Sequence, residues 1–339
     1  NSAVVPASMA RFRTSGWSVM VRVSRTGIVF GGLLLAVAAR ADAVAPYELL
    51  DRMNEAVRLL DYEGRFVVQS GDRLDAMYIV HRVTQGVEKE RVVSLTGKPR
   101  EIIRSDQAVA CKLAGRDVHI NVGLRSNGRS FSPLRGVSGS QLDASYHIEM
   151  LEPGRVAGRD SYQILIQPRD ELRYGYRLLI DQVSALPLQS VMFDERERPV
   201  SKMMFVELRV DRAITPIEHD LSAMQLARAD PDDYLPVERF APPDWVFPEL
   251  PPGFHLNVHR RKALGQTAGE REHFIFSDGL ASVSVYVQPV GNDAGLSGVS
   301  RLGLAKAVGR IVDGYEVIVV GEVPTKTLHW FAQQIQAAP

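Results

Sequence analysis

Short segments in which apolar and polar residues alternate fill most of the chain between residues 65 and 211, and this repetition limits the fold more than any other feature. Alternation with a period of two is typical of β-strands. Turn-forming segments rich in Gly, Asp and Pro, such as 70–72 and 97–99, separate the strands. We therefore expect a large, mainly antiparallel β domain. Its candidate strands are Arg65–Ser70, Leu74–Val83, Glu90–Leu95, Glu101–Arg104, Ala108–Leu113, Val118–Val122, Tyr146–Leu151, Tyr162–Gln167, Tyr174–Asp181, Leu188–Asp194 and Ser201–Asp211.

A helix is predicted just before these strands, because apolar residues recur at helical spacing from Pro46 to Leu60 and Gly64 follows. Several strands are apolar on both faces, whereas a sheet with one face in water alternates more cleanly. A helix or a ligand must therefore cover the second face, and a curved sheet folded over helices fits this pattern. In the last strand, one predicted face has Met204, Val206, Leu208 and Val210, and the other has Met203 and Phe205.

Four apolar residues on these strands are candidate ligand contacts, namely Met77, Met203, Met204 and Phe205. Methionine suits this role because its flexible side chain adapts to varied shapes, but each of the four also fits an ordinary core. The segment 123–145 is rich in Gly and Ser and predicts a long loop, either a solvated insertion or a binding segment. Its arginines, Arg125, Arg129 and Arg135, are candidates for contacting the phosphates of a lipid head group.

Prolines are dense from Thr215 to Pro252 and indicate a domain boundary, so we predict a large domain at 44–212, a linker at 213–237 and a small domain at 238–339. In the small domain, Phe254, Leu256 and Val258 alternate with His255, Asn257 and His259. Asp278 and Gly279 predict a hairpin turn. Five strands and a closing helix are expected, giving an α+β chain overall. The remaining elements are strands at Glu272–Ser277, Ala281–Gln288, Leu302–Val312 and Tyr315–Gly321, and a helix that starts near Pro324.

The first 43 residues carry the features of an export signal. Arg22 and Arg25 precede thirteen uncharged residues, 27–39, and Ala41-Asp42-Ala43 fits signal peptidase. The alternative is a retained anchor, but this apolar run is short for a bilayer span. We expect cleavage near Val44, residues 1–19 to be an upstream extension of the reading frame, and a protein without stable membrane insertion.

Composition and missing motifs argue against several functions. From Val44 onward the chain has 35 basic and 39 acidic residues, which disfavours nucleic acid as a partner. A single cysteine, Cys111, excludes disulfides within the chain. The chain has no nucleophile elbow, P-loop, dinucleotide fingerprint or zinc-protease motif. His255 and His259 lie about 13 Å apart in an extended strand and cannot share one metal ion. We expect no enzyme activity, metal or cofactor.

Several segments together resemble the RseB/MucB family of periplasmic regulators of envelope-stress sigma factors. They are YELLDRMNEAVRLLDYEGRFVV (47–68), RYGYRLLIDQVSALPLQSVMFDERERPV (173–200), LPPGFHLNVHRRK (250–262), FSDGLASVSVYVQP (276–289) and VIVVGEVPTKTLHWFAQQIQ (317–336). The resemblance covers nearly all of 44–339. No single motif is diagnostic, but the ordered set is specific.

This resemblance implies a curved half-barrel, similar to the periplasmic lipoprotein carriers, that is open to lipopolysaccharide or another acylated ligand. It also implies that the small domain binds the periplasmic domain of a RseA/MucA-type anti-sigma factor, shielding it from site-1 proteolysis until a lipid or mislocalised-lipoprotein signal arrives. Arg260 and Arg261 are candidate partner contacts, as are Asp278 and Gly279, although the latter two also suit a purely structural turn. The alternatives are a lipid or lipoprotein carrier or chaperone and, less favoured, an envelope hydrolase. Formation of a homo-oligomer stays open.

Overall fold

The computed structural model describes residues 45–105, 109–113, 116–119, 139–210, 243–263, 269–291, 298–302 and 304–339. Residues Val44–Pro339 form one compact unit. The predicted export signal and the predicted linker at 213–237 lie outside the described residues, so the predicted domain boundaries stay predictions. Below, the large domain means the described residues within 45–210, and the small domain means those within 243–339.

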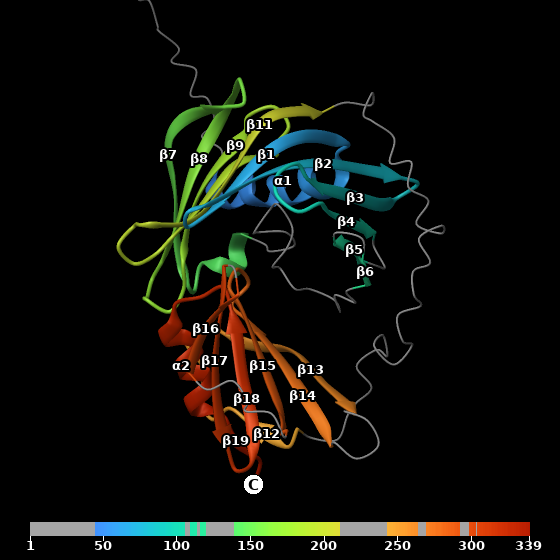
Figure 1. The fold of residues 1–339 in the computed structure, drawn as a ribbon. Helices are drawn as coiled ribbons and strands as arrows, with labels where there is room; N and C mark the ends of the chain where they lie inside the picture. Colours follow the sequence, from blue (N-terminus) through green and yellow to red (C-terminus); the bar gives the residue numbers. More distant parts are fainter. Residues whose placement is uncertain are drawn as a thin grey trace, which may run out of the picture. The chain divides into compact units, whose positions relative to one another are not determined.

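Within its described residues, the large domain has one eleven-stranded antiparallel sheet, in the order β6-β5-β4-β3-β2-β1-β11-β10-β9-β8-β7 (Figure 1). Each strand overlaps a predicted strand, so the predicted antiparallel architecture is confirmed. Two meanders, β1 to β6 and β7 to β11, join where β1 pairs with β11. The strands are β1 (Tyr62–Ser70), β2 (Arg73–Thr84), β3 (Val87–Ser94), β4 (Arg100–Ser105), β5 (Val109–Leu113), β6 (Arg116–His119), β7 (Tyr146–Val156), β8 (Arg159–Pro168), β9 (Gly175–Asp181), β10 (Pro187–Phe193) and β11 (Pro199–Val210).

Helix α1 (Pro46–Leu59) lies along one face of this sheet, which curves around it (Figure 1). Pro46 suits the first turn, where a backbone N–H has no partner within the helix. The helix buries one apolar stripe that joins strand residues such as Ile79 and Phe205 in a common core. The helix therefore covers part of the face for which the two-sided strands required a cover. The buried residues of α1 are Leu49, Leu50, Met53, Ala56 and Val57.

A β-bulge in β11 changes the predicted faces of that strand. Arg65 pairs with Glu207 and the next residue of β1, Phe66, pairs with Phe205, which leaves Val206 without a partner on β1. One extra residue reverses the alternation beyond it. Leu208 is therefore buried in the same core as Phe205, while Val206 is 54% exposed. The prediction that Val206 and Leu208 share a face is wrong, because simple alternation does not reveal a bulge.

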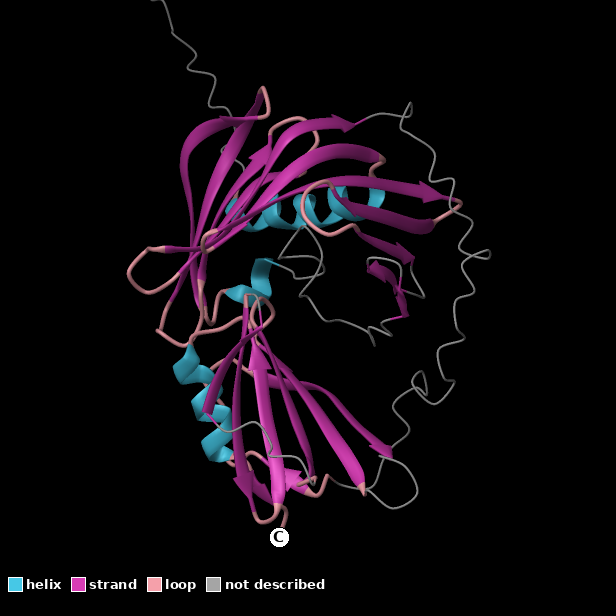
Figure 2. Cartoon of the chain, viewed as in Figure 1, coloured by secondary structure: helices cyan, strands magenta, loops and turns pink. Residues whose placement is uncertain are grey.

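The small domain has a six-stranded antiparallel sheet in the order β13-β14-β15-β18-β17-β16, counted within its described residues. Helix α2 (Thr325–Gln334) packs on one face through Leu328 and Phe331, which share a core with Phe274 and Phe276. Figure 2 shows the dominance of strands in both domains. The strands are β13 (His255–Ala263), β14 (Glu270–Ser277), β15 (Ser282–Pro289), β16 (Gly298–Leu302), β17 (Ala305–Val312) and β18 (Tyr315–Gly321), with a small pair β12 (Trp245–Val246) and β19 (Gln336–Ala337).

Two features of the small sheet differ from the prediction. The segment 302–312 was expected to be one strand, but Leu302 pairs with Ala305 and the chain reverses between β16 and β17. The second difference is a bulge at Asn257, because Leu256 pairs with Phe276 and Val258 with Ile275. The bulge reverses the faces of the following residues. No helix in the described part of the chain is long and apolar enough to cross a bilayer.

Candidate functional site

The two domains meet at a buried arginine, Arg173, in the segment between β8 and β9. Its guanidinium is completely buried and donates to Asp278 Oδ2 at 2.5 Å, across the domain junction. It also donates to the carbonyl oxygen of Pro252 at 2.5 Å and to both carboxylate oxygens of Asp170 at 3.0 Å. The ring of Phe254 lies 5.1 Å from its Cζ. Every group around Arg173 therefore favours its positive charge.

Asp278, the ion-pair partner of Arg173 across the junction, lies in the predicted turn between β14 and β15. Its Oδ1 accepts the backbone N–H groups of Leu280 at 2.9 Å and Ala281 at 2.7 Å, as Asp commonly does in turns. Its Oδ2 accepts the hydroxyl of Tyr146 at 3.0 Å in addition to Arg173. Burial, and then the charge of Asp278, raises the pKa of Tyr146 well above its usual value, so this hydroxyl stays a donor. The hairpin turn predicted at Asp278 and Gly279 is confirmed.

Further contacts fix the same junction. Thr327, in the first turn of α2, donates its hydroxyl to the carbonyl oxygen of Leu172, and Lys326 pairs with Glu171. Gly253 has a φ of +79°, and a Cβ added there would lie 2.2 Å from the Ser145 hydroxyl. Only glycine fits this close approach without a shift. The segment that carries Arg173 is therefore held by three different parts of the small domain.

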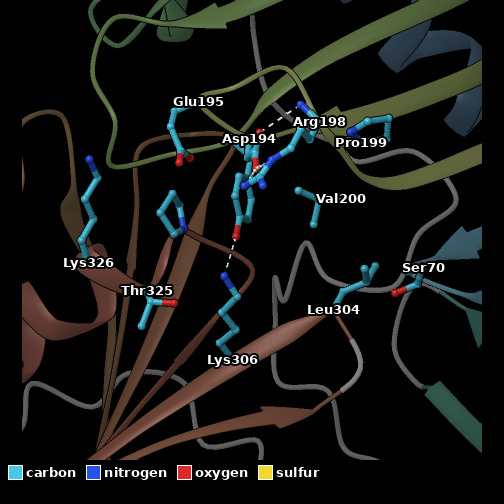
Figure 3. A pocket seen from close by; sticks show the side chains of 13 residues that line it. Ser70, Asp194, Glu195, Arg198, Pro199, Val200, Leu304, Lys306, Thr325 and Lys326 are labelled. Atoms are coloured by element: carbon cyan, nitrogen blue, oxygen red, sulfur yellow. Dashed lines mark hydrogen bonds and ion pairs between the residues drawn. The ribbon is translucent and has the colours of Figure 1, made fainter.

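A cavity of about 610 Å³ adjoins this junction and is lined by residues of both domains (Figure 3). Lys306 of β17 reaches into it and donates to the hydroxyl of Tyr174 at 3.0 Å. On its rim, Arg198 and Asp194 form an ion pair at 2.7 Å. Val200 and Leu304 add apolar surface. A molecule bound here would touch both domains, so its affinity would depend on how the domains are arranged.

The four predicted apolar ligand contacts lie in or against the core of the large domain. Met77, Met203 and Phe205 are buried in it, at 7%, 7% and 1% exposure, and Met204 is half-buried beside it. Their burial places them among the residues that contact α1 and its neighbours, and ligand contact by them stays a prediction. The three predicted head-group arginines, Arg125, Arg129 and Arg135, lie outside the described residues.

The two adjacent arginines predicted to contact a partner face opposite sides of the small sheet. Arg261 lies on the side of Glu272 and approaches three carboxylates, those of Asp244 at 2.9 Å, Glu272 at 3.4 Å and Glu270 at 3.8 Å. Arg260 lies on the other side, directly across from His273. Asp278 is committed to Arg173 within the chain. Partner contact by these residues stays a prediction.

Sequence reasoning missed the junction itself. Arg173, Tyr146 and Lys306 were not singled out, because nothing in their local pattern reveals partners that lie 105 or more positions away, as with Arg173 and Asp278 or Tyr146 and Asp278. One signal was present, since Arg173 lies two residues before β9, a strand that is apolar on both faces, where a charge needs a buried partner. Among the described residues, no group of His, Cys, Asp and Glu side chains is arranged to hold a metal ion.

Comparison with known proteins identifies the family of the chain. The model of the MucB/RseB N-terminal domain matches residues 45–227, and that of the MucB/RseB C-terminal domain matches residues 239–336. The chain is 30% identical to the sigma factor AlgU regulatory protein MucB of Pseudomonas aeruginosa over 318 residues, covering 90% of this chain and 95% of that protein. It is 26% identical to the sigma-E factor regulatory protein RseB of Escherichia coli over 320 residues, covering 91% of this chain and 96% of that protein.

Solved structures agree. The complex of MucA and MucB from Pseudomonas aeruginosa contains a chain that is 27% identical to this one, with a TM-score of 0.64. The match covers 87% of this chain and 99% of that chain. A crystal structure of MucB with MucA(peri) gives a TM-score of 0.63 at the same identity, covering 87% of this chain and 100% of that one. Because the likeness spans both domains, this chain belongs to the MucB/RseB family of sigma-factor regulators, a family of regulatory proteins rather than enzymes.

Proposed function

We propose that this protein works in the periplasm and binds the periplasmic domain of a membrane-bound anti-sigma factor. Binding shields the anti-sigma factor from site-1 proteolysis, so the envelope-stress sigma factor stays inactive. A lipid, lipopolysaccharide or mislocalised lipoprotein then weakens the complex and allows proteolysis. The observation that carries the proposal is the similarity to MucB, which covers 90% of this chain, because MucB was crystallised in complex with MucA(peri).

The junction between the domains supports coupling between the two binding events. Arg173 and Asp278 form a fully buried ion pair between the domains. A buried pair is costly to separate, so two arrangements of the domains differ sharply in stability if one keeps this ion pair and the other breaks it. A lipid and the anti-sigma segment that favour different arrangements weaken each other by the same factor. The predicted linker at 213–237 supplies the length of chain for such a change.

The first experiment is a calorimetric titration of the chain from Val44 onward with the periplasmic domain of the same organism's anti-sigma factor. We expect a dissociation constant in the micromolar range or tighter. The same titration with saturating lipopolysaccharide should give a clearly weaker affinity. A site-1 protease assay then tests shielding, because bound anti-sigma factor should be cleaved more slowly than free anti-sigma factor. Equal affinity with and without lipopolysaccharide would remove the sensing part of the proposal.

The competing function is a carrier of lipids or lipoproteins that uses the large domain alone. It predicts bound acyl chains in the purified protein and no affinity for the anti-sigma factor. Native mass spectrometry of the purified chain distinguishes the two, because a carrier retains lipid while a regulator co-purifies with its protein partner. A truncated chain that ends before 238 adds a second test, since removal of the small domain should abolish anti-sigma binding if the proposal is correct.

A further inference from the structure

The face of the small sheet opposite α2 carries a cluster of cationic and aromatic side chains on three neighbouring strands. Arg260 of β13 lies directly across from His273 of β14, which in turn lies across from Tyr286 of β15. The rings of His273 and Tyr286 stack with centroids 4.2 Å apart. Arg271, two residues before His273 on β14, points to the same face. We call these four residues the basic face.

None of the four residues of the basic face is an acid, and the carboxylate of Glu316 on β18 reaches this cluster through Gln288, which donates to it at 2.8 Å. Among the described residues, the side chain of Arg260 makes no hydrogen bond or ion pair, and the side chain of Arg271 donates to the neutral amide of Gln288 at 2.7 Å. Arg261, one residue further along β13, approaches three carboxylates on the α2 side. Arg260 and Arg271 occupy diagonal positions on neighbouring strands, where like charges repel each other, and an acidic partner offsets that repulsion.

The same two guanidiniums contribute to a low pKa of His273. Burial, and then the charges of Arg260 and Arg271 and of His259, lowers the pKa of His273 to about 4. The groups that face it are Arg260 from β13, Arg271 on its own strand and the phenol of Tyr286 from β15. The imidazole is therefore neutral at pH 7, and the positive field on this face comes from the two guanidiniums.

The position of β13 at the edge of the sheet also favours an extended partner. This strand is at the edge of the small sheet and pairs only with β14 in the part of the chain that the structure describes. An edge strand presents backbone N–H and C=O groups to one side, which an extended peptide can pair with. Acidic side chains of such a peptide alternate between its two faces, so those on one face meet Arg260 and Arg271.

We propose that the basic face and the adjoining edge of β13 bind an extended acidic segment of the anti-sigma factor's periplasmic domain. This inference rests on the proposed function and deepens it by naming the surface and the chemistry of the bound segment. The side chain of Arg260 thus serves the partner, whereas that of Arg261 serves the fold. Two neighbouring residues of one type have opposite roles because successive side chains of a strand face opposite sides.

The test compares matched variants in the calorimetric titration with the periplasmic domain of the anti-sigma factor. Arg260→Gln and Arg271→Gln should each weaken binding about tenfold, which corresponds to about 1.4 kcal/mol. Arg155→Gln, at an exposed arginine of β7 in the large domain, is the control and should leave the dissociation constant within about twofold at a temperature where circular dichroism shows every variant folded. Raising the salt concentration should weaken binding by the unsubstituted protein more than binding by Arg260→Gln.

The outcomes separate this inference from the proposed function. If the unsubstituted protein binds and both Arg260→Gln and Arg271→Gln bind equally well, the basic face is overturned and the proposed function stands. If the unsubstituted protein does not bind, both fall. An Arg260→Gln effect on self-association alone, seen by sedimentation, would assign the face to a second copy and overturn the inference. Hydrogen exchange sharpens a positive result, since the amides of β13 should exchange more slowly in the complex.

Discussion

Two arginines of this protein occupy opposite electrostatic situations. Arg173 is completely buried at the domain junction, where two carboxylates, a carbonyl oxygen and an aromatic ring surround it. Arg260 lies on a sheet face where its neighbours are Arg271 and the neutral ring of His273, and its side chain makes no ion pair among the described residues. A charge whose partners lie within the chain holds the chain together. A charge whose neighbours repel it lowers stability and fits a role in recognition.

The largest expected effect comes from breaking the junction. Arg173→Met leaves Asp278 buried without its ion-pair partner and should lower the free energy of unfolding by about 3–5 kcal/mol. Asp278→Asn should cost a similar amount, and the double variant should lose less than the sum of the two single losses because they share one interaction. Urea unfolding followed by circular dichroism measures all three. A loss below about 1 kcal/mol for Arg173→Met would contradict the structural role of the pair.

Acidification should destabilise the small domain through His273. Its pKa in the folded protein is about 4, against an ordinary value of 6.5, so the unfolded chain binds the proton more readily. The stability that the neutral imidazole provides is complete above pH 6.5 and is lost as the pH falls toward 4, by up to about 3 kcal/mol. His273→Gln should flatten the dependence of the unfolding free energy on pH within this window. An unchanged slope would show that other groups cause it.

Removing the charge of Arg260 should slightly stabilise the protein, whereas the changes above destabilise it. Arg260→Gln relieves the repulsion by Arg271 and should raise the free energy of unfolding by less than about 1 kcal/mol, even as it weakens partner binding. It should also raise the pKa of His273, which NMR titration of the ring protons can follow. Arg261→Gln is the matched control and should lower stability, because it leaves three carboxylates without their cation. A loss of stability in both variants would remove the contrast between the two arginines.

The smallest effect is expected on the rim of the cavity. Arg198 is 64% exposed at the side chain and pairs with Asp194 four positions earlier. Exposed pairs of this kind contribute little to stability because water and salt screen them, so Arg198→Gln should hardly move the urea midpoint. It thereby serves as the reference against which the loss in Arg173→Met is judged. A loss from Arg198→Gln as large as that from Arg173→Met would mean that burial does not explain the difference.

The strands could be predicted from the sequence, but the faces of their residues could not always be assigned. A period of two in hydrophobicity follows directly from burial of one side of a strand, which explains why all eleven strands of the large sheet were found. The bulges at Val206 and Asn257 each insert one residue and reverse the faces that follow, and simple alternation of apolar and polar residues does not reveal them. The bulge at Asn257 places Arg260 and Arg261 on the faces that they occupy.

The candidate site was only partly predictable for a related physical reason. Arg260, Arg261 and Asp278 could be named as candidates because they stand beside recognisable strands and turns, and their contact with a partner stays a prediction. Arg173 and Tyr146 were missed because their partner, Asp278, lies 105 and 132 positions away. Hydrogen bonds across such separations depend on how whole sheets meet, and local residue patterns carry no information about this.

The pairing of β1 with β11 also sets the order in which the large domain is completed. Tyr62 pairs with Val210, so the two strands that close the sheet are separated by nearly the whole domain. Bringing such distant strands together costs loop-closure entropy and slows folding relative to local hairpins. A chain that emerges N-terminus first cannot cover the edge of β1 until β11 has appeared. Protection of that edge during folding is therefore a requirement built into this topology.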